Sequence, residues 1–352
     1  MSYRFPDRLA PLLACLALAI TVLPAAARGT VQQNRPADGA VFEGVRAKDM
    51  RLAAIGWRLA AANVALCDRR EPGLGIQLHA LDQYDSSVRD AARLHFGFAT
   101  PVAVEGVLAD SPAARAGLRA DDSLVRVGGI EIAALPGKPG TTQKLVAAQL
   151  AIAALPPAAR IEVDALRAGV PVHMSIDPQP ACKSRFELEL DDGFGASADG
   201  TMVQVSSGLL DAYPDDQLAA AVAHEFSHNI LHHRDRLEAR GVDFGMLAGF
   251  GANVKYFRQT ETEADLLSVY LLANAGYDPR AAVRFWQAFG PSKAGGILRS
   301  RSHPAWRDRV ATLEAEIARL ETMSARPIVP PLVATRDQPL NGDWQSILVR
   351  HR

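Results

Sequence analysis

The sequence has little excess charge of one sign, few cysteines and no apolar run as long as a membrane span. Its 38 basic and 39 acidic residues give a formal net charge of −1, and this balance gives no indication of a nucleic-acid partner. Only 3 of the 352 residues are cysteine. With 48% hydrophobic residues, the chain is long enough for two domains that each have a hydrophobic core.

The apolar run near the N-terminus extends over Leu9–Leu23, which is short of the about 20 residues that a membrane-spanning helix needs. Two arginines precede it, and the small residues Ala25–Ala27 follow it. This order is typical of an export signal, so we predict a signal peptide over residues 1–27 and a periplasmic or otherwise exported protein. Two alternatives stay open: an uncleaved signal that anchors the chain in the membrane, and a lipoprotein modified at Cys15.

A segment rich in predicted strands, residues 96–178, differs from the sequence around it. Alternating valines in "PVAVEGVL" predict a strand, and "SPAARAG" predicts a short helix that ends at Gly117. Two strands around the tight turn Gly128-Gly129, an amphipathic helix in "TTQKLVAAQLAIAAL" and a hairpin around Ala168-Gly169 follow. We predict that this β-rich segment is a domain inserted into the chain.

The flanking segments, residues 42–95 and 179–324, are predicted to form one mainly helical domain with a small sheet. A helix is expected over Phe42–Arg69, ended by "REPGLG", and later ones in "QLAAAVAHEFSHNILHH", "TETEADLLSVYLLANAG", "RAAVRFWQAF" and "PAWRDRVATLEAEIARLETM". Residues 28–42 are expected to be flexible. The Pro-rich tail, residues 325–352, is expected to be extended or disordered, with a terminal strand in "WQSILVRHR". The predicted fold class is therefore α+β.

The stretch "AVAHEFSHNILHH" carries His224, Glu225 and His228 in the order H-E-x-x-H. This short motif indicates a zinc site only on a helix, where the periodicity places it. Residues four apart lie on one helix face with Cβ atoms about 5–6 Å apart, so both imidazoles can bind one ion. Glu225 is turned by about a quarter of a turn and can face a water molecule on that ion as a general base. We predict one Zn²⁺ per chain.

A catalytic zinc ion usually has three protein ligands and one open position, and "ETEAD" on the next helix supplies the third ligand. Glu261 and Asp265 are four apart and share a face. We assign Glu261 to the metal, and Asp265 to a hydrogen bond that fixes the tautomer of a ligand histidine. Glu263 points roughly opposite and is predicted to be a surface charge, and His232 a charge at the helix end. The alternative is a network of salt bridges between the helices without a metal, which is costly to bury.

Together with "SHPAWRDR" and the strand "MVQVSSGLL", these residues resemble the gluzincin zinc metallopeptidases of the HtpX and CAAX-prenyl-protease type, and among them the exported, BepA-like members. The resemblance covers about residues 42–95 and 183–324. It implies a zinc-dependent endopeptidase, often one that acts in the quality control of envelope proteins. The chain lacks the several membrane spans of the integral-membrane members, so substrate handling inside a membrane is not implied.

The resemblance also implies roles for residues outside the ligand set. His303 matches the His-Pro motif of the family, which lies near the metal and contacts the substrate or gates the site, and Arg309 matches the basic residue after it. An alternative is that Ser302 or His303 merely caps the helix that follows. We predict Glu225 and His303 as catalytic residues. The strand predicted to hold the substrate backbone in extended form is Met202, Val203, Gln204 and Val205.

A short helix and a glycine turn at set spacing characterise the β-rich segment, and the residues that define them are Ser111-Pro112-Ala113-Ala114, Ala116-Gly117-Leu118, Asp122, Val125, Val127 and Gly129. This pattern resembles a PDZ domain of the kind found with bacterial proteases. The resemblance implies binding of extended chain ends, by addition of a strand to a sheet edge beside a carboxylate-binding loop. Two segments compete for that loop, Phe96–Phe98 and Gly73–Ile76. A PDZ-shaped spacer without a ligand is the alternative.

Loss of the signal peptide removes Cys15 and leaves Cys67 and Cys182, and two thiols in an oxidising compartment often pair. Cys67 ends the helix before the β-rich segment, and Cys182 follows its last strand. If the segment leaves and re-enters the surrounding domain at one place, its two ends lie close together. We therefore predict a Cys67–Cys182 disulfide, with two unpaired buried thiols as the alternative.

The leading hypothesis is a zinc endopeptidase that cleaves unfolded or misfolded proteins of the cell envelope. The zinc ion would polarise the scissile carbonyl and lower the pKa of its water to about 7. Glu225 would take the proton of the water and pass it to the leaving amine, while the PDZ-like domain binds chain ends of substrates or partners. The competing hypothesis is a PDZ-like chaperone or scaffold whose zinc is structural or latent, although a structural site does not need a base such as Glu225.

Overall fold

The parts of the chain that the computed structural model describes are residues 36–242, 253–293, 304–324 and 326–350. Helices and strands both contribute to them, which confirms the predicted α+β class. Within these ranges, no helix is both long enough and apolar enough to cross a membrane. The predicted signal peptide, residues 1–27, and His303 lie outside the described residues.

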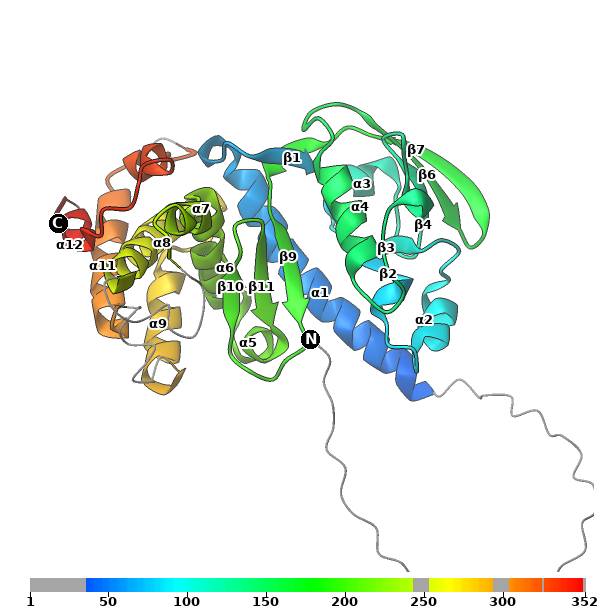
Figure 1. The fold of residues 1–352 in the computed structure, drawn as a ribbon, viewed down its shortest axis with the longest axis horizontal. Helices are drawn as coiled ribbons and strands as arrows, with labels where there is room; N and C mark the ends of the chain where they lie inside the picture. Colours follow the sequence, from blue (N-terminus) through cyan, green and yellow to red (C-terminus); the bar gives the residue numbers. More distant parts are fainter. Residues whose placement is uncertain (1–35, 243–252, 294–303, 325, 351–352) are drawn as a thin grey trace, which may run out of the picture. The chain divides into compact units, whose positions relative to one another are not determined.

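The first helix, α1 (Pro36–Ala62), begins inside residues 28–42, so the prediction of a flexible segment there is wrong for its C-terminal part. Proline suits the first turn of a helix, because its missing N–H would have no partner there. Further along, Leu52 and Leu59 lie on one face, and each is at most 1% exposed. Helix α1 contacts both the β-rich segment and the helical part of the chain (Figure 1).

The β-rich segment contains a six-stranded antiparallel sheet and three helices. In chain order its elements are β2 (Ile76–Ala80), α2 (Arg89–Phe96), β3 (Val102–Val107), α3 (Pro112–Ala116), β4 (Ser123–Val127), β5 (Ile130–Glu131), α4 (Gln143–Ala153), β6 (Ile161–Arg167) and β7 (Val170–Ile176). The strand order is β2-β3-β4-β6-β7, with β5 paired to β4. Strand β2 is therefore an edge of this sheet.

The sheet begins before the predicted domain boundary at residue 96. Strand β2 pairs with β3 along its whole length, and Leu78 of β2 is buried in the same hydrophobic cluster as Val102 and Val104 of β3. A boundary at residue 96 would cut through this sheet, so that part of the prediction is wrong. The local pattern of "IQLHA" indicates a strand, but only tertiary packing selects its partner.

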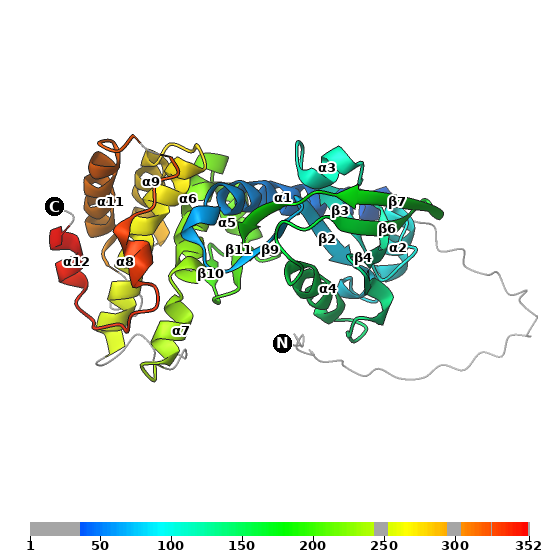
Figure 2. The same cartoon turned by 90° about the horizontal axis from the view of Figure 1, so that it is seen from above.

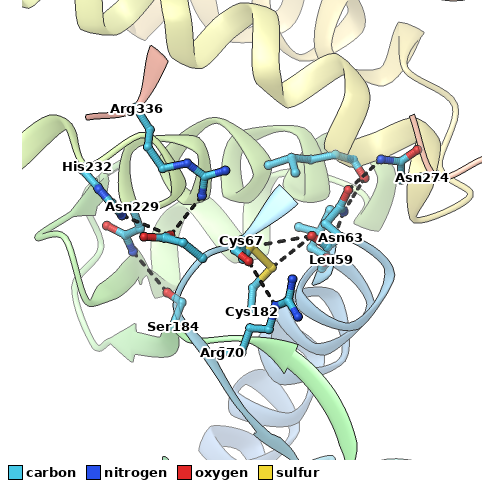
Figure 3. The surroundings of a disulfide bond; sticks show 12 residues. Leu59, Asn63, Cys67, Arg70, Cys182, Ser184, Asn229, His232, Asn274 and Arg336 are labelled. Carbon is cyan, nitrogen blue, oxygen red and sulfur yellow. Dashed lines mark hydrogen bonds and ion pairs between the residues drawn. A yellow bond between two sulfur atoms is a disulfide. The ribbon is translucent and has the colours of Figure 1, made fainter. Parts of the chain in front are cut away.

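Two short strands connect the β-rich segment to the rest of the chain. Strands β1 (Arg70–Gly73) and β8 (Gln179–Cys182) pair antiparallel, with Arg70 opposite Cys182. The stretch "REPG", expected only to end a helix, thus forms a strand. Beside this pair, a disulfide joins Cys67 to Cys182, whose Cα atoms lie 5.5 Å apart (Figure 3). The segment leaves and re-enters its surroundings at one place.

A second sheet has three strands, which are β9 (Arg185–Glu189), β10 (Ala196–Ala198) and β11 (Met202–Ser206). Their order is β10-β11-β9, with β11 antiparallel to β10 and parallel to β9. Strand β11 is hydrogen-bonded on both sides and has no edge to offer. The prediction that Met202, Val203, Gln204 and Val205 hold a substrate backbone is therefore wrong.

The other elements are short 3₁₀ helices and the α-helices of the C-terminal half. They are η1 (Val64–Leu66), η2 (Leu81–Gln83), η3 (Ile132–Ala134), α5 (Ser207–Ala212), α6 (Asp215–Ile230), α7 (His233–Glu238), α8 (Val254–Asn274), α9 (Arg280–Lys293), α11 (Trp306–Leu320), η5 (Pro331–Thr335) and α12 (Trp344–Arg350). Helices α6, α8, α9 and α11 pack on one another (Figures 1 and 2). The described tail includes η5 and α12, so the predicted terminal strand is wrong. Leu340 is fully buried beside Leu237 of α7, which explains the order of the tail.

The helical part has a hydrophobic core of its own, in which α1, α6, α8 and α11 bury apolar residues around β11. Phe186 of β9 packs against this core. Its ring lies edge-on to Phe226 of α6, with ring centroids 5.3 Å apart. On its other side it contacts α1 at Gly56, where a Cβ atom would lie 2.4 Å from the ring. Glycine at position 56 therefore allows this ring to sit between the two helices.

Candidate metal centre

The H-E-x-x-H motif lies in α6, which packs against α8. The helix starts after Pro214 with Asp215 and Asp216 in its first turn, where negative charge interacts favourably with the helix dipole. Most of its circumference is buried, including Leu218 and Val222. Polar side chains on the face toward α8 are consequently enclosed between the two helices.

The structure brings together the three predicted metal ligands. Nε2 of His224 lies 3.3 Å from Nε2 of His228 and 3.4 Å from Oε2 of Glu261. Nε2 of His228 lies 3.6 Å from Oε1 of Glu261. Ligands about 2.0–2.2 Å from a tetrahedral zinc ion are about 3.3–3.6 Å from one another. The three side chains therefore fit a zinc ion with one coordination position left open.

Asp265 lies where it can orient one ligand. Its Oδ1 is 3.0 Å from Nδ1 of His224, so the other ring nitrogen, Nε2, faces the metal position. Arg309 of α11 donates from Nε to Oδ2 of Asp265 at 2.8 Å. The guanidinium also lies over the Trp286 ring, 3.6 Å from its centroid. Asp265 and Arg309 are 2% and 3% exposed, so this charge pair is shielded from solvent.

The second ligand has a different neighbour. Nδ1 of His228 lies 2.9 Å from Nδ1 of His233, and Nε2 of His233 lies 2.9 Å from Oε2 of Glu263. Arg236 donates to the same Glu263 oxygen at 2.6 Å, and Gln259 donates to its other oxygen at 2.8 Å. Glu263 is 2% exposed. The prediction that it is a surface charge is wrong, because α7 folds back over this face of α8.

His232, predicted to be a charge at a helix end, is 6% exposed at the junction of α6 and α7. Its backbone has φ +52°, a left-handed conformation that is uncommon for a residue other than glycine. Its ring nitrogens face Asp337 at 3.0 Å and Asp68 at 3.2 Å. The sharp turn at His232 directs the next residue, His233, back toward His228.

Buried charges determine which groups bind protons when no metal is present. Burial and Arg309 act to lower the pKa of His224, but Asp265 and Glu261 outweigh them and raise it to about 9. Burial holds the pKa of His228 well below its ordinary value despite the nearby Glu261. Burial acts to raise the pKa of Asp265, but Arg309 and His224 lower it. Asp265 thus stays charged, and metal binding must displace the proton of His224.

The two predicted catalytic residues differ in what the structure describes. Glu225 is half-buried on α6, next to His224 in the chain. His303 lies outside the described residues, so its predicted role stays a prediction. The residues that sequence reasoning missed are His233 and Arg236. Little in the sequence points to them. His233 comes five residues after His228, and helix α6 ends between the two at Ile230, so helical spacing does not fix where His233 lies.

Comparison with known proteins supports the metal site. The model of Peptidase family M48 matches residues 193–255 and 244–317. Residues 193–317 are thus similar to the peptidase domain of family M48. The matched residues contain the three ligand residues, Glu225 and Asp265. The β-rich segment lies outside the M48 match.

Relatives of this chain include the mitochondrial metalloendopeptidase OMA1 of two organisms. The protein of Schizosaccharomyces pombe is 27% identical over 137 residues, which cover 33% of this chain and 41% of that protein. The protein of Arabidopsis thaliana is 28% identical over 111 residues, which cover 27% of this chain and 22% of that protein. The chain thus spans less than half the length of either relative. A solved structure of the HtrA-type protease AlgW with decapeptide is 22% identical, covers 32% of this chain and 30% of that chain, and has a TM-score of 0.23, which is too low to support a conclusion.

A cavity lies beside β2, and its lining includes none of the three predicted metal ligands. It is lined on one side by the loop Gly73–Ile76 and by Gln149 and Ile152 of α4, and on the other by residues that include Trp57 of α1 and Phe186 of β9. The cavity is therefore bounded by an edge strand and a helix of the β-rich segment, and is closed by elements outside it.

The structure distinguishes the two loops that compete for a carboxylate. Phe96 and Phe98 are buried in a small aromatic cluster with Phe42. The loop Gly73–Ile76 lines the cavity. Among the described residues, no acceptor is hydrogen-bonded to the backbone N–H groups of Leu74 and Gly75. The loop Gly73–Ile76 is thus the better candidate for binding an anionic group.

Proposed function

We propose that this protein is a zinc-dependent endopeptidase. The observation that carries the proposal is the convergence of donor atoms from His224, His228 and Glu261, at separations that suit tetrahedral zinc, within the residues similar to family M48. A zinc ion bound there would polarise the scissile carbonyl and lower the pKa of a water molecule to about 7.

The chain's own residues would handle the protons and the orientation of the ligands. Glu225 would accept the proton of the attacking water and return it to the leaving amine. Asp265, hydrogen-bonded to Nδ1 of His224 and held by Arg309, would keep Nε2 of His224 available to the metal. His303 would contact the substrate or stabilise the developing oxyanion, as the resemblance to gluzincins implies.

An extended substrate would add to β10 (Ala196–Ala198). This strand is an edge of its sheet, whereas its neighbour β11 is paired on both sides. Strand β10 also packs against α6, the helix that carries the motif. Backbone hydrogen bonds to an edge strand bind a substrate independently of most of its side chains, which suits an enzyme that cleaves unfolded chains.

The β-rich segment would bind the carboxyl ends of substrate or partner chains. A chain end would add as a strand to β2, with its carboxylate at the N–H groups of Leu74 and Gly75. The open edge of β2 and the adjoining cavity support this part of the proposal. Export of the protein, and therefore envelope proteins as substrates, is supported by the signal-like pattern of residues 1–27 alone. An uncleaved signal would instead anchor the protein in the membrane.

The experiment combines metal analysis with cleavage of an unfolded protein by wild type and Glu225→Gln. The variant should keep its zinc and its fold, because no ligand changes, and should lose at least about a hundredfold in cleavage rate, because the base is removed. Glu238→Gln, an exposed glutamate on α7, is the matched control and should cleave like wild type. A Glu225→Gln variant within tenfold of wild type would contradict the mechanism. Zinc-loaded wild type that binds unfolded protein and never cleaves it would favour a chaperone or scaffold.

A further inference from the structure

We propose that His233, Glu263 and Arg236 form a chain of hydrogen bonds that positions the metal ligand His228. None of the three belongs to the proposed ligand set of His224, His228 and Glu261. They are positioning residues that act through His228. The inference depends on the proposed metal site, but it does not depend on proteolysis.

The direction of the hydrogen bonds follows from which ring nitrogen of His228 faces the metal position. If Nε2 of His228 faces the metal, its proton is on Nδ1, which therefore donates to Nδ1 of His233 at 2.9 Å. That nitrogen of His233 must accept, so the proton of His233 is on Nε2 and is donated to Glu263 at 2.9 Å. The Glu263 carboxylate accepts this bond together with those from Arg236 and Gln259. This arrangement satisfies each group in the chain.

The two ligand histidines are thus oriented by different means. His224 has a carboxylate, Asp265, directly on its Nδ1. His228 reaches a carboxylate only through a second imidazole. His233 cannot replace His228 as a ligand in this geometry, because its Nδ1 faces the nitrogen of His228 that points away from the metal position. Glu263 and Glu261 lie on the same helix, so α8 supplies both a ligand and the end of this chain of hydrogen bonds.

The structure gives reasons why the arrangement is held in place. His233, Arg236 and Glu263 are 1%, 6% and 2% exposed, so water does not compete for their bonds. Arg236 also donates to the backbone oxygen of Gln338 at 2.9 Å, which ties α7 to the C-terminal tail. The left-handed backbone of His232 sets the direction of α7.

The first test measures the zinc dissociation constant of the full chain by competition with a chelator. Glu263→Gln should raise it by about tenfold, the low end of the effect of removing a hydrogen-bond partner of a ligand, because Glu263 acts on His228 through His233. Glu316→Gln is the matched control: Glu316 is also a buried carboxylate, 1% exposed, and it bonds Tyr270 of α8 rather than a residue next to a ligand. The control should leave the constant unchanged. A Glu263→Gln value within twofold of wild type would overturn the proposal, and wild type that binds no zinc would overturn both it and the metal site.

The second test separates His233 from Glu263. The Oδ1 of an asparagine takes the place of Nδ1 in histidine, so His233→Asn should keep an acceptor for His228 and lose less zinc affinity than His233→Phe. In the His233→Phe background, Glu263→Gln should have no further effect, because the connection is already broken. If the losses of zinc affinity caused by His233→Phe and Glu263→Gln simply add in the double variant, Glu263 acts through the stability of the fold and not through His233. If Glu263→Gln fails to fold, the two His233 variants decide: zinc affinities equal to wild type in both would overturn the proposal.

Discussion

Buried carboxyl groups gather in two regions of this molecule, and their surroundings have opposite effects on them. At the metal centre, Glu263 and Asp265 have pKa values below the ordinary range, although burial alone would raise them. A second group of buried carboxyls lies where α1, β3 and β9 meet, and we call Asp49, Glu105 and Glu187 the junction carboxyls. Their pKa values are above the ordinary range, and that of Asp49 is about 7.

The difference is due to the groups that contact each carboxylate rather than to depth. Glu263 accepts hydrogen bonds from His233 and Arg236, and Asp265 is paired with Arg309 and His224. Burial raises the pKa of each junction carboxyl, and Asp49 is further affected by the charge of Glu187. The comparison shows that a buried carboxylate keeps its charge where His233, Arg236 or Arg309 donates to it directly, whereas at the junction Arg46 and Arg185 do not outweigh burial.

The largest expected effect is at Arg309. Replacing it with methionine leaves Asp265 with His224 as its remaining partner, and should lower the free energy of unfolding by about 3 kcal/mol at pH 7, the low end of the range for breaking a buried ion pair, measured by urea denaturation. Arg46 of α1 is paired with the partly exposed Asp121 and lowers the pKa of Glu105 by its charge. Arg46→Met should lower the free energy of unfolding less, because Glu105 and Asp49 can bind protons instead. A loss at Arg46 as large as that at Arg309 would break the comparison.

The next effect concerns the Cys67–Cys182 disulfide. A double Cys67→Ala, Cys182→Ala variant should lower the free energy of unfolding by about 2–5 kcal/mol, the usual range for loss of a native disulfide. Hydrogen exchange should speed up first in β1 and β8, which meet at the disulfide. Non-reducing mass analysis of wild type purified without reductant should find one bond between the two peptides. Two free thiols there would contradict the predicted disulfide.

The pH dependence of stability should separate the two regions. Asp49 has a folded pKa of about 7 against an ordinary value of 3.8, so its contribution is full below about pH 4 and is lost as the pH rises to about 7. One fully linked proton gives a slope of about 1.4 kcal/mol per pH unit, and Asp49→Asn should remove a large part of it. Glu263, with a folded pKa of about 2 against 4.5, loses its contribution only as the pH falls below about 4.5. An unchanged slope between pH 4 and 7 in Asp49→Asn would refute the assignment.

The smallest expected effect is on ligand binding at the cavity. Burial raises the pKa of Glu71, which lines the cavity, to about 7. Above that pH its charge should repel a terminal carboxylate, so a peptide with a free carboxyl end should bind about two- to fivefold more weakly at pH 8 than at pH 6. Glu71→Gln should remove most of the difference, measured by fluorescence anisotropy, and Glu187, which also lines the cavity and has a raised pKa, should account for the rest. An amidated peptide of the same sequence should show no pH effect, and equal binding of both peptides would favour a spacer.

Local spacing accounts for what the sequence could predict. His224, His228 and Glu225 lie within one helix, and a helix fixes their relative directions whatever surrounds it. The spacing of Glu261 and Asp265 works in the same way on α8. The packing of Glu261 and Asp265 against α6 could also be predicted, because a buried pair of histidines needs a polar or charged partner.

Contacts between distant segments explain the features that the sequence could not predict. Glu263 was expected in solvent because its position on α8 opposes Glu261, yet α7 covers that face. The turn that brings α7 there is made at His232, a residue whose left-handed backbone no local pattern indicates. Strand β2 likewise pairs with β3, from which residues 81–101 separate it. In both cases the partner lies outside the window that a local sequence pattern covers.

The position of Phe186 has a thermodynamic consequence. Its ring lines the cavity beside β2 and also contacts Phe226, which lies between Glu225 and Ser227 within the H-E-x-x-H motif. A peptide that shifts this ring on entering the cavity would change the packing of the motif helix, and its binding would then be linked to that of the metal. Such linkage is reciprocal: the factor by which the peptide changes the affinity for zinc equals the factor by which zinc changes the affinity for the peptide.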